Sequence, residues 1–220
     1  MRIFTIFRIS LSFFSIILLT TCTIAQVINE PAKIKEGEPI IYLDSNASID
    51  DRVDDLLARM TLMEKVAQME QIVRFPENDE IKNLVTTVGI GSALNGGPHL
   101  VSSFKKRQEL IELSLQSRLK IPIILAGEAI KGLKSGSNTS SFPGGLNWGS
   151  TFNPELCEKA TSIIAREFRA NGTHWAIAPG VCISRDPRWG RNGETFGEDP
   201  YLTSVMGRAY TRGLEGKTKP

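Results

Sequence analysis

Two patterns of apolar residues alternate along most of the chain. In one, apolar residues recur every three or four positions, which predicts helices at about 48–60, 61–72, 80–86, 101–119, 153–171 and from 199 to 213 or 216. In the other, short runs are almost entirely apolar, which predicts buried strands at about 88–94, 121–126 and 174–179. Strands that alternate with helices indicate right-handed crossover connections and a parallel sheet.

Four of the predicted helices begin at residues that commonly cap a helix. Ser48 and Thr61 each stand three positions before an acidic residue, which is the spacing of a capping box. Asn153 and Asp199 each precede a proline, the arrangement of an N-cap followed by the first helical position. Gly172 follows the fifth helix and suits its C-terminal end.

Residues 1–25 have the pattern of a secretory signal peptide. Arg2 and Arg8 come first, the apolar run 9–19 follows, and small and polar residues end the segment. The run is too short to span a bilayer as a helix, and no later segment is long and apolar enough to do so. We therefore expect an exported protein without a membrane span, periplasmic, secreted or at the cell surface. Residues 26–47 are expected to be an extended N-terminal segment.

The composition excludes several functional classes. Hydrophobic residues make up 41% of the 220 residues and charged residues 23%, as in a globular protein with a substantial core. The 26 basic and 24 acidic side chains give a net charge of +2, and the leader accounts for two of the arginines. A mature chain with almost no net charge lacks the basic surface of a nucleic-acid-binding protein, so we expect no nucleic-acid partner.

The few cysteines and histidines give no sign of a metal centre. Cys157 and Cys182 follow the leader; one disulfide is conceivable, but two buried thiols are the simpler interpretation. His99 and His174 are far apart in sequence, so we expect no metal and no cofactor. Whether Cys22, in a weak lipoprotein-like context, carries a lipid stays open.

Two loops stand where an α/β fold places its functional residues. The segments 127–145 and 180–199 each follow a predicted strand, and active residues of α/β barrels lie in loops at the carboxyl ends of the strands. A complete eight-stranded barrel takes about 250 residues. The chain is shorter than that, and only three of its predicted strands are convincing.

The second loop carries an unusual block of residues, Arg185-Asp186-Pro187-Arg188-Trp189-Gly190-Arg191, followed by Glu194-Thr195-Phe196-Gly197-Glu198-Asp199-Pro200-Tyr201-Leu202. This block resembles the signature of glycoside hydrolase family 3, which includes β-glucosidases and β-xylosidases. Residues 62–69, 141–143, 152–156 and 178–179 fit the same pattern. The resemblance runs from about residue 49 to residue 216. It implies an α/β fold in which residues 48–220 form the N-terminal part of a TIM-type (β/α)8 barrel, incomplete as given.

The resemblance also implies two substrate-binding residues. Arg191 matches the family's arginine that donates to sugar hydroxyls, and Glu128 matches its carboxylate that accepts from the far hydroxyls; such charge-assisted bonds are strong. The alternatives are that Arg191 braces the loop through Glu194 or Asp199, and that Glu128 is a solvated loop acid. Arg185, Asp186 and Arg188 are expected to hold the loop together. Trp189 is expected to anchor it, with stacking on a sugar as the alternative.

Two positions depart from the commonest pattern of the family. Glu128 stands where β-glucosidases commonly have Asp, and the longer acid is more like the β-xylosidase branch. Lys131 stands where the family commonly has His, which adds a permanent charge on a flexible stem. The resemblance therefore implies a β-glucosidase type of activity, with β-xylosidase specificity as the alternative.

The catalytic carboxylates of the family are not found in this stretch. Retaining hydrolysis needs a nucleophile and an acid/base about 5 Å apart, and in the family both follow the segment matched here. We expect them beyond Pro220, so residues 1–220 alone should be inactive. We also expect the missing part of the barrel, or a partner, to cover the open edge of the sheet. A non-catalytic relic that binds sugar or regulates a full-length relative is the other alternative.

Overall fold

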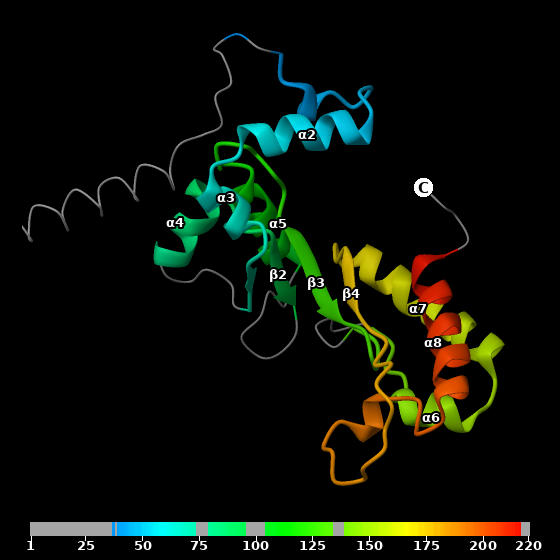
Figure 1. Ribbon diagram of the computed structural model, residues 1–220. Helices are drawn as coiled ribbons and strands as arrows, with labels where there is room; N and C mark the ends of the chain where they lie inside the picture. Colours follow the sequence, from blue (N-terminus) through cyan, green and yellow to red (C-terminus); the bar gives the residue numbers. More distant parts are fainter. Residues whose placement is uncertain (1–36, 38, 74–78, 96–103, 134–138, 217–220) are drawn as a thin grey trace, which may run out of the picture. The chain divides into compact units, whose positions relative to one another are not determined.

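The computed structural model describes residues 37, 39–73, 79–95, 104–133 and 139–216 (Figure 1). Contacts divide the chain into two compact units, Met1–Met69 and Glu70–Pro220. The predicted leader lies outside the described residues, as do residues 26–36 of the predicted extended segment. None of the helices in the described ranges is long and apolar enough to cross a membrane.

The described residues of the first unit form three helices, and the caps of the two α-helices are those predicted. They are η1 (Ile41–Leu43), α2 (Ile49–Arg59) and α3 (Leu62–Ala67). The Ser48 hydroxyl accepts a hydrogen bond from the backbone of Asp51 at 3.1 Å, and Thr61 and Glu64 cap each other reciprocally. The prediction that the second helix continues to residue 72 is wrong, because α3 ends at Ala67 and a strand begins soon after it.

The second unit is built on a parallel sheet. Its strands are β1 (Gln71–Ile72), β2 (Ser92–Asn95), β3 (Ile124–Glu128) and β4 (Trp175–Ile177), which lie in sequence order and pair in parallel throughout. The connecting and following helices are α4 (Asp79–Thr87), α5 (Phe104–Ser114), α6 (Gly145–Ser150), α7 (Pro154–Ala170) and α8 (Pro200–Glu215), with a short 3₁₀ helix, η2 (Asn192–Glu194). The predicted α/β class with a parallel sheet is confirmed. Strands in sequence order are the arrangement found along a (β/α) barrel.

Several predicted boundaries differ from the structure for local reasons. The strand predicted at 88–94 begins only at Ser92, since Gly89 has a positive φ of 82° that interrupts the extended backbone. The helix predicted at 101–119 is α5, which ends at Ser114, whose hydroxyl accepts from the backbone of Ile123 at 3.1 Å. The strand that follows starts at Ile124, three residues later than predicted. A two-residue strand, β1, and the short helix α6 carry no periodic pattern and were not predicted.

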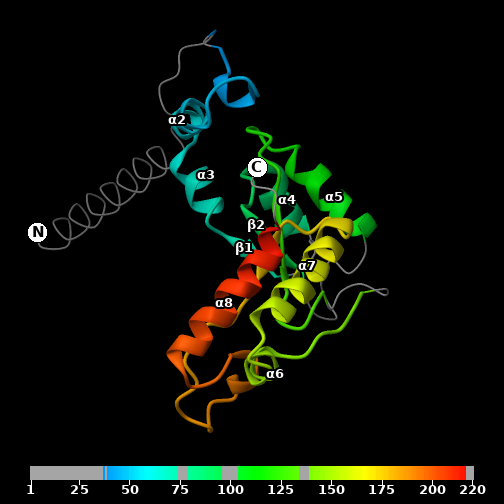
Figure 2. The same ribbon diagram turned by 90° about the vertical axis from the view of Figure 1, so that its right-hand side faces the viewer.

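Helices α7 and α8 form the clearest helix pair of the second unit and lie side by side in both views (Figures 1 and 2). Asn153 and Asp199 accept hydrogen bonds from the third helical residues at 2.9 Å, as their N-cap positions predict. Gly213 is where the helices approach most closely, because a Cβ there would lie 1.8 Å from the Thr161 hydroxyl. Beneath them is a core cluster made of Trp148, Cys157, Ala160, Phe196, Met206, Ala209 and Tyr210.

The two cysteines of the second unit are not equivalent. Both are free thiols, and Cys157 is buried in the core cluster whereas Cys182 is exposed. The prediction of two buried thiols is therefore correct for Cys157 and wrong for Cys182. Burial raises the pKa of the Cys157 thiol to about 11.

Candidate functional site

The carboxyl ends of β3 and β4 bring together the two segments that carry the predicted site residues. Glu128 is the last residue of β3, pairs in register with Ile177 of β4, and has an exposed side chain. From β4 the chain enters the loop that carries Arg191, and a bridge between Gly180 and Thr195 ties the two arms of this loop together. Both predicted residues thus belong to segments at the carboxyl edge of the sheet, where parallel α/β folds place their active sites.

The loop between β4 and α8 is held by its own side chains. Asp186 and Arg188 form an exposed ion pair at 2.6 Å, as predicted for a loop-stabilising role. Asn192 spans the loop, because its amide donates to the backbone of Asp186 at 2.8 Å and its oxygen accepts from the Ser184 hydroxyl at 2.5 Å. Arg185, predicted to take part, makes no side-chain hydrogen bond or ion pair with the described residues.

The apolar anchor of this loop is Phe196 and not Trp189. The Phe196 side chain is 2% exposed and belongs to the core cluster, whereas Trp189 is 39% exposed. No sequence pattern distinguishes Phe196 from Trp189 as the anchor, since both aromatic residues belong to the same signature block. The exposed ring of Trp189 stands at a turn in which its backbone N–H bonds to the carbonyl of Asp186 at 3.1 Å.

Arg191 is held by Glu194. Its Nη2 and Nε donate to Glu194 Oε2 at 2.6 Å and 3.0 Å. This hydrogen bonding raises the pKa of Arg191, and the more distant charge of Glu128 acts in the same direction. The carboxylates of Glu194 and Glu128 therefore both favour the charged form of the guanidinium. Of the two bracing partners considered for Arg191, Glu194 is the one observed, whereas Asp199 caps α8.

Pairing with Glu194 does not bury Arg191. The Arg191 side chain is 67% exposed, so its guanidinium remains accessible to a ligand. An exposed ion pair of this kind contributes little to stability, because water screens the two charges. The bracing contact and a binding role are therefore compatible.

A small cavity of about 70 Å³ lies between the two segments, lined by Glu128, Ile130, Lys131, Gly132 and Glu194. It brings Glu128 together with Glu194, the observed partner of Arg191. Lys131, one of the two departures noted from the sequence, also lines this cavity and is exposed. The site thus combines two carboxylates with two cationic side chains close by.

The glycines of α6 allow the loop to approach this helix closely. A Cβ on Gly145 would lie 2.3 Å from the backbone oxygen of Glu194, and one on Gly149 would lie 2.2 Å from that of Phe196. A Cβ on Gly144 would meet the backbone oxygen of Gly193 at 2.5 Å. All three distances are far shorter than any ordinary contact of a Cβ atom, so only glycine permits this packing. Helix α6, which was not predicted, therefore packs directly against η2 and the residues that follow it.

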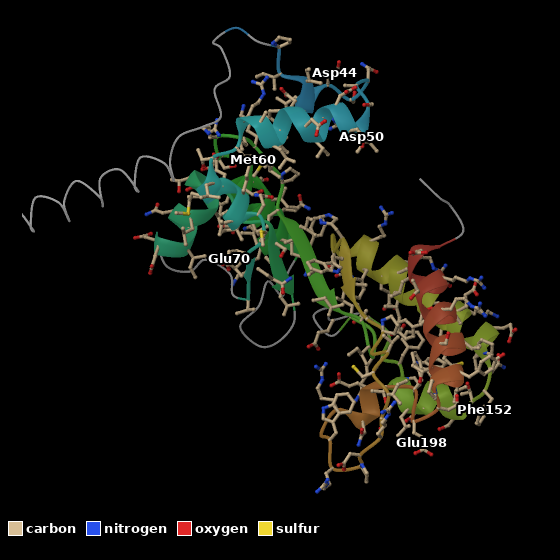
Figure 3. The ribbon with its side chains drawn as sticks, in the orientation of Figure 1. Asp44, Asp50, Met60, Glu70, Phe152 and Glu198 are labelled. Atoms are coloured by element: carbon tan, nitrogen blue, oxygen red, sulfur yellow. The ribbon has the colours of Figure 1, made fainter. Side chains whose placement is uncertain are left out.

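A larger cavity lies elsewhere in the described part of the chain. It measures about 680 Å³ and is lined mainly by α8 together with Pro179, Val181 and Ile183. Size alone would favour it as a ligand site. We favour the smaller cavity, because it lies at the carboxyl edge of the sheet and is lined by Glu128 and by Glu194, the partner of Arg191. Glu198, labelled in Figure 3, is exposed and does not line the small cavity.

Metal ligands are not grouped in the described ranges. No three His, Cys, Asp or Glu side chains within those ranges lie close enough together to hold a metal ion. His99 lies outside the described residues. The chemistry on which this site can draw is that of carboxylate acceptors and a guanidinium donor, the groups suited to a ligand with several hydroxyls.

Fold and site together define an α/β protein with carboxylate and guanidinium groups on neighbouring segments at the carboxyl edge of its parallel sheet. Residues 61–218 match the family described as "Glycosyl hydrolase family 3 N terminal domain", and the chain belongs to this family. The resemblance noted from the signature loop is thereby confirmed.

The similar proteins include some named as β-glucosidases and others named as β-xylosidases. The chain is 35% identical over 168 residues to a periplasmic β-glucosidase of Salmonella typhimurium, which covers 76% of this chain and 21% of that protein. It is 32% identical over 188 residues to a putative β-xylosidase of Formosa agariphila, covering 80% and 25%. A crystal structure of a β-glucosidase from Listeria innocua in complex with glucose is 31% identical with a TM-score of 0.65, covering 77% of this chain and 24% of that one.

The chain spans between about a fifth and a quarter of the length of these proteins. The chain therefore belongs to the family, whereas the activities and substrates in the names of these relatives are those of the full-length proteins.

Proposed function

We propose that the protein at its native length is an exported glycoside hydrolase of β-glucosidase type, which cleaves terminal β-glycosidic bonds with retention. The observation that supports this most is that Glu128 ends β3 and Arg191 lies in the loop after β4, on neighbouring segments at one edge of the sheet, in a chain of this family. The named relatives favour a β-glycoside as substrate.

In this proposal Glu128 and Arg191 hold one sugar ring. The Glu128 carboxylate accepts from vicinal hydroxyls, and the Arg191 guanidinium donates to a hydroxyl oxygen. Arg191 uses Nε and Nη2 for Glu194. A guanidinium has five N–H donors in a planar fork, so donors remain for the sugar while Glu194 fixes the orientation of the group.

The catalytic carboxylates are proposed to lie outside residues 1–220. Glu194 is engaged by Arg191, and Glu128 serves the hydroxyls, so neither is free for the nucleophile or the acid/base role. The test compares hydrolysis of p-nitrophenyl β-D-glucoside by the native-length protein and by residues 26–220. Turnover by the native-length protein alone supports the proposal. A native-length protein that binds glucose without turnover contradicts it and favours the non-catalytic relic.

β-Xylosidase specificity is the second candidate, and it rests on Glu128. A glutamate is one methylene longer than the aspartate common among β-glucosidases, and in the pocket of a pentose it would fill the space of the missing hydroxymethyl group. Glu128→Asp in the native-length protein should then shift the ratio of kcat/KM for p-nitrophenyl β-D-xyloside and β-D-glucoside toward the glucoside. An unchanged ratio would show that Glu128 does not discriminate between the two sugars.

We also propose that further strands of the same barrel cover the free edge of β4. Among the described residues β4 pairs only with β3, and beyond β4 the side chain of Val181 is more than half exposed beside the cavity along α8. An uncovered parallel edge invites association with other chains. Light scattering should show residues 26–220 aggregating where the native-length protein does not. A soluble, monodisperse fragment would contradict this proposal, and a fragment rescued only by a separate protein would favour a partner.

Export is proposed from the residues before position 26, because they follow the order of a signal peptide. The match to a periplasmic relative is in keeping with it. Intact mass and N-terminal sequencing of the protein from its source should find a mature chain beginning near Gln26. A chain that still begins at Met1 would contradict export by cleavage.

A further inference from the structure

Tyr210 of α8 contacts both segments that carry the proposed sugar-binding residues, and it does so from within the core. Its side chain is 1% exposed, so it lies wholly within the core cluster. The sequence does not indicate a functional role for Tyr210, since the residue occupies an apolar position of a predicted helix. Two contacts, one through its hydroxyl and one through its ring, give it a role beyond filling space.

The first contact reaches the residue that follows Glu128. The Tyr210 hydroxyl donates to the backbone oxygen of Ala129 at 2.5 Å, across 81 positions of sequence. Ala129 is fully buried, and its other backbone hydrogen bonds are longer: 3.4 Å to Ile177 and 3.4 Å from Gly132. The phenol is therefore the closest polar partner of the peptide group at which the chain leaves β3, directly after the proposed sugar-binding carboxylate.

The second contact reaches the loop that carries Arg191. The Tyr210 ring meets Phe196 edge to face, with ring centroids 6.2 Å apart and planes at 61°. From Phe196 back to Arg191 the backbone is fixed by hydrogen bonds from Glu194 to Arg191 at 3.0 Å and from Thr195 to Asn192 at 3.1 Å. A displacement of Phe196 is thus passed on to the guanidinium.

We propose that Tyr210 is a positioning residue that sets Glu128 relative to Arg191 and thereby determines how tightly the sugar ring is held. The inference rests on the proposed function of these two residues. Burial raises the pKa of Tyr210 well above that of a free phenol, so the hydroxyl carries its proton at neutral pH and can donate. The side chain acts through Ala129 and Phe196 and does not touch the substrate.

Tyr210→Phe tests the inference with a minimal change, because the ring and its contact with Phe196 remain. Loss of the hydroxyl leaves the buried Ala129 oxygen without its closest donor, and we expect KM for p-nitrophenyl β-D-glucoside to rise about 3- to 10-fold with little change in kcat. Tyr201→Phe is the matched control, since Tyr201 lies on the same helix and is 79% exposed. It should leave KM unchanged. The assays use the protein at its native length.

A double-mutant cycle with Glu128→Gln separates positioning from general destabilisation. If Tyr210 acts through Glu128, Tyr210→Phe should change KM less than twofold once Glu128 is replaced. The same fold-change in both backgrounds, or no change in either, would overturn the inference while leaving the sugar site intact. If Glu128→Gln alone leaves KM unchanged, the proposed role of Glu128 fails and the inference with it.

A second variant covers the case in which Tyr210→Phe yields too little folded protein. Phe196→Leu keeps an apolar side chain but removes the ring that Tyr210 meets. It should raise KM in the parent protein and have less than a twofold effect when Arg191 is replaced by Gln. Equal effects in both backgrounds would again overturn the positioning role.

Discussion

Gly149→Ala tests the packing of the signature loop against α6, because two physical effects predict opposite signs for it. Alanine is favoured over glycine inside a helix by about 0.5–1 kcal/mol, so helix propensity alone predicts a more stable protein. The added Cβ, however, would lie 2.2 Å from the backbone oxygen of Phe196, whereas real Cβ atoms essentially never come within 3.0 Å. A backbone carbonyl cannot rotate aside as a flexible side chain can, so the loop must move.

The steric effect should win. Overpacking of this kind costs about 1–3 kcal/mol, and the gain in propensity offsets only part of it. We expect a net loss of about 1–2 kcal/mol. Because the displaced segment carries Arg191, we also expect a higher KM for a β-glucoside. Urea unfolding followed by tryptophan fluorescence measures the first effect, since Trp148 of α6 is buried in this core.

Gly190→Ala is the matched control, because a Cβ at Gly190 would have no atom within 4 Å. It should change the free energy of unfolding by no more than about 0.5 kcal/mol. A Gly149→Ala variant that unfolds at a higher urea concentration than the parent would refute the close packing of α6 on the loop.

Three further predictions concern caps, charge and thiols. Asp199→Ala removes the acceptor for the backbone N–H of Leu202 and should lower the free energy of unfolding by about 1 kcal/mol in urea titrations, whereas Glu198→Ala next to it should not. Hydrogen bonds from Arg59 lower the pKa of Asp55 in the folded protein. The ionised Asp55 carboxylate therefore stabilises the fold fully above the unfolded pKa of about 3.9, and this stabilisation is lost as the pH falls through the lower folded pKa. The difference in Tm between the parent protein and Asp55→Asn should shrink as the pH is lowered from above about 4 to below the folded pKa. Because the pKa of Cys157 is raised to about 11 and Cys182 is exposed, iodoacetamide at pH 7.5 should label Cys182 in the folded protein and Cys157 only after unfolding, as peptide mass spectrometry can show.

Features that depend on neighbouring residues were predictable from the sequence, and those that depend on distant contacts were not. The caps at Ser48, Thr61, Asn153 and Asp199 are local hydrogen bonds, so the helix starts after them are as predicted. The start of β3 was misplaced because an apolar run does not show where strand pairing begins. Helix α6 is rich in glycine, a residue with low helix propensity, so the sequence did not predict it. The helix is instead supported by its contacts with the loop residues 193–196.

The site shows the same division. Glu128 and Arg191 were found through the motif, and the ion pair with Glu194 was one of the alternatives that the spacing allowed. That Glu194 shares a cavity with Glu128 depends on how the segments after β3 and β4 are placed in the fold, which no local pattern reveals. Tyr210 is the extreme case, since its hydroxyl reaches a peptide group 81 positions away.

The most direct test of the sugar site is kcat/KM for p-nitrophenyl β-D-glucoside in the native-length protein and in Glu128→Gln, with Glu198→Gln as control. A charge-assisted hydrogen bond contributes about 1.5–3 kcal/mol, so Glu128→Gln should lower kcat/KM about 10- to 100-fold. Glu198 is an exposed acid outside the small cavity, and its replacement should have no effect. Equal values for the two variants would contradict the account.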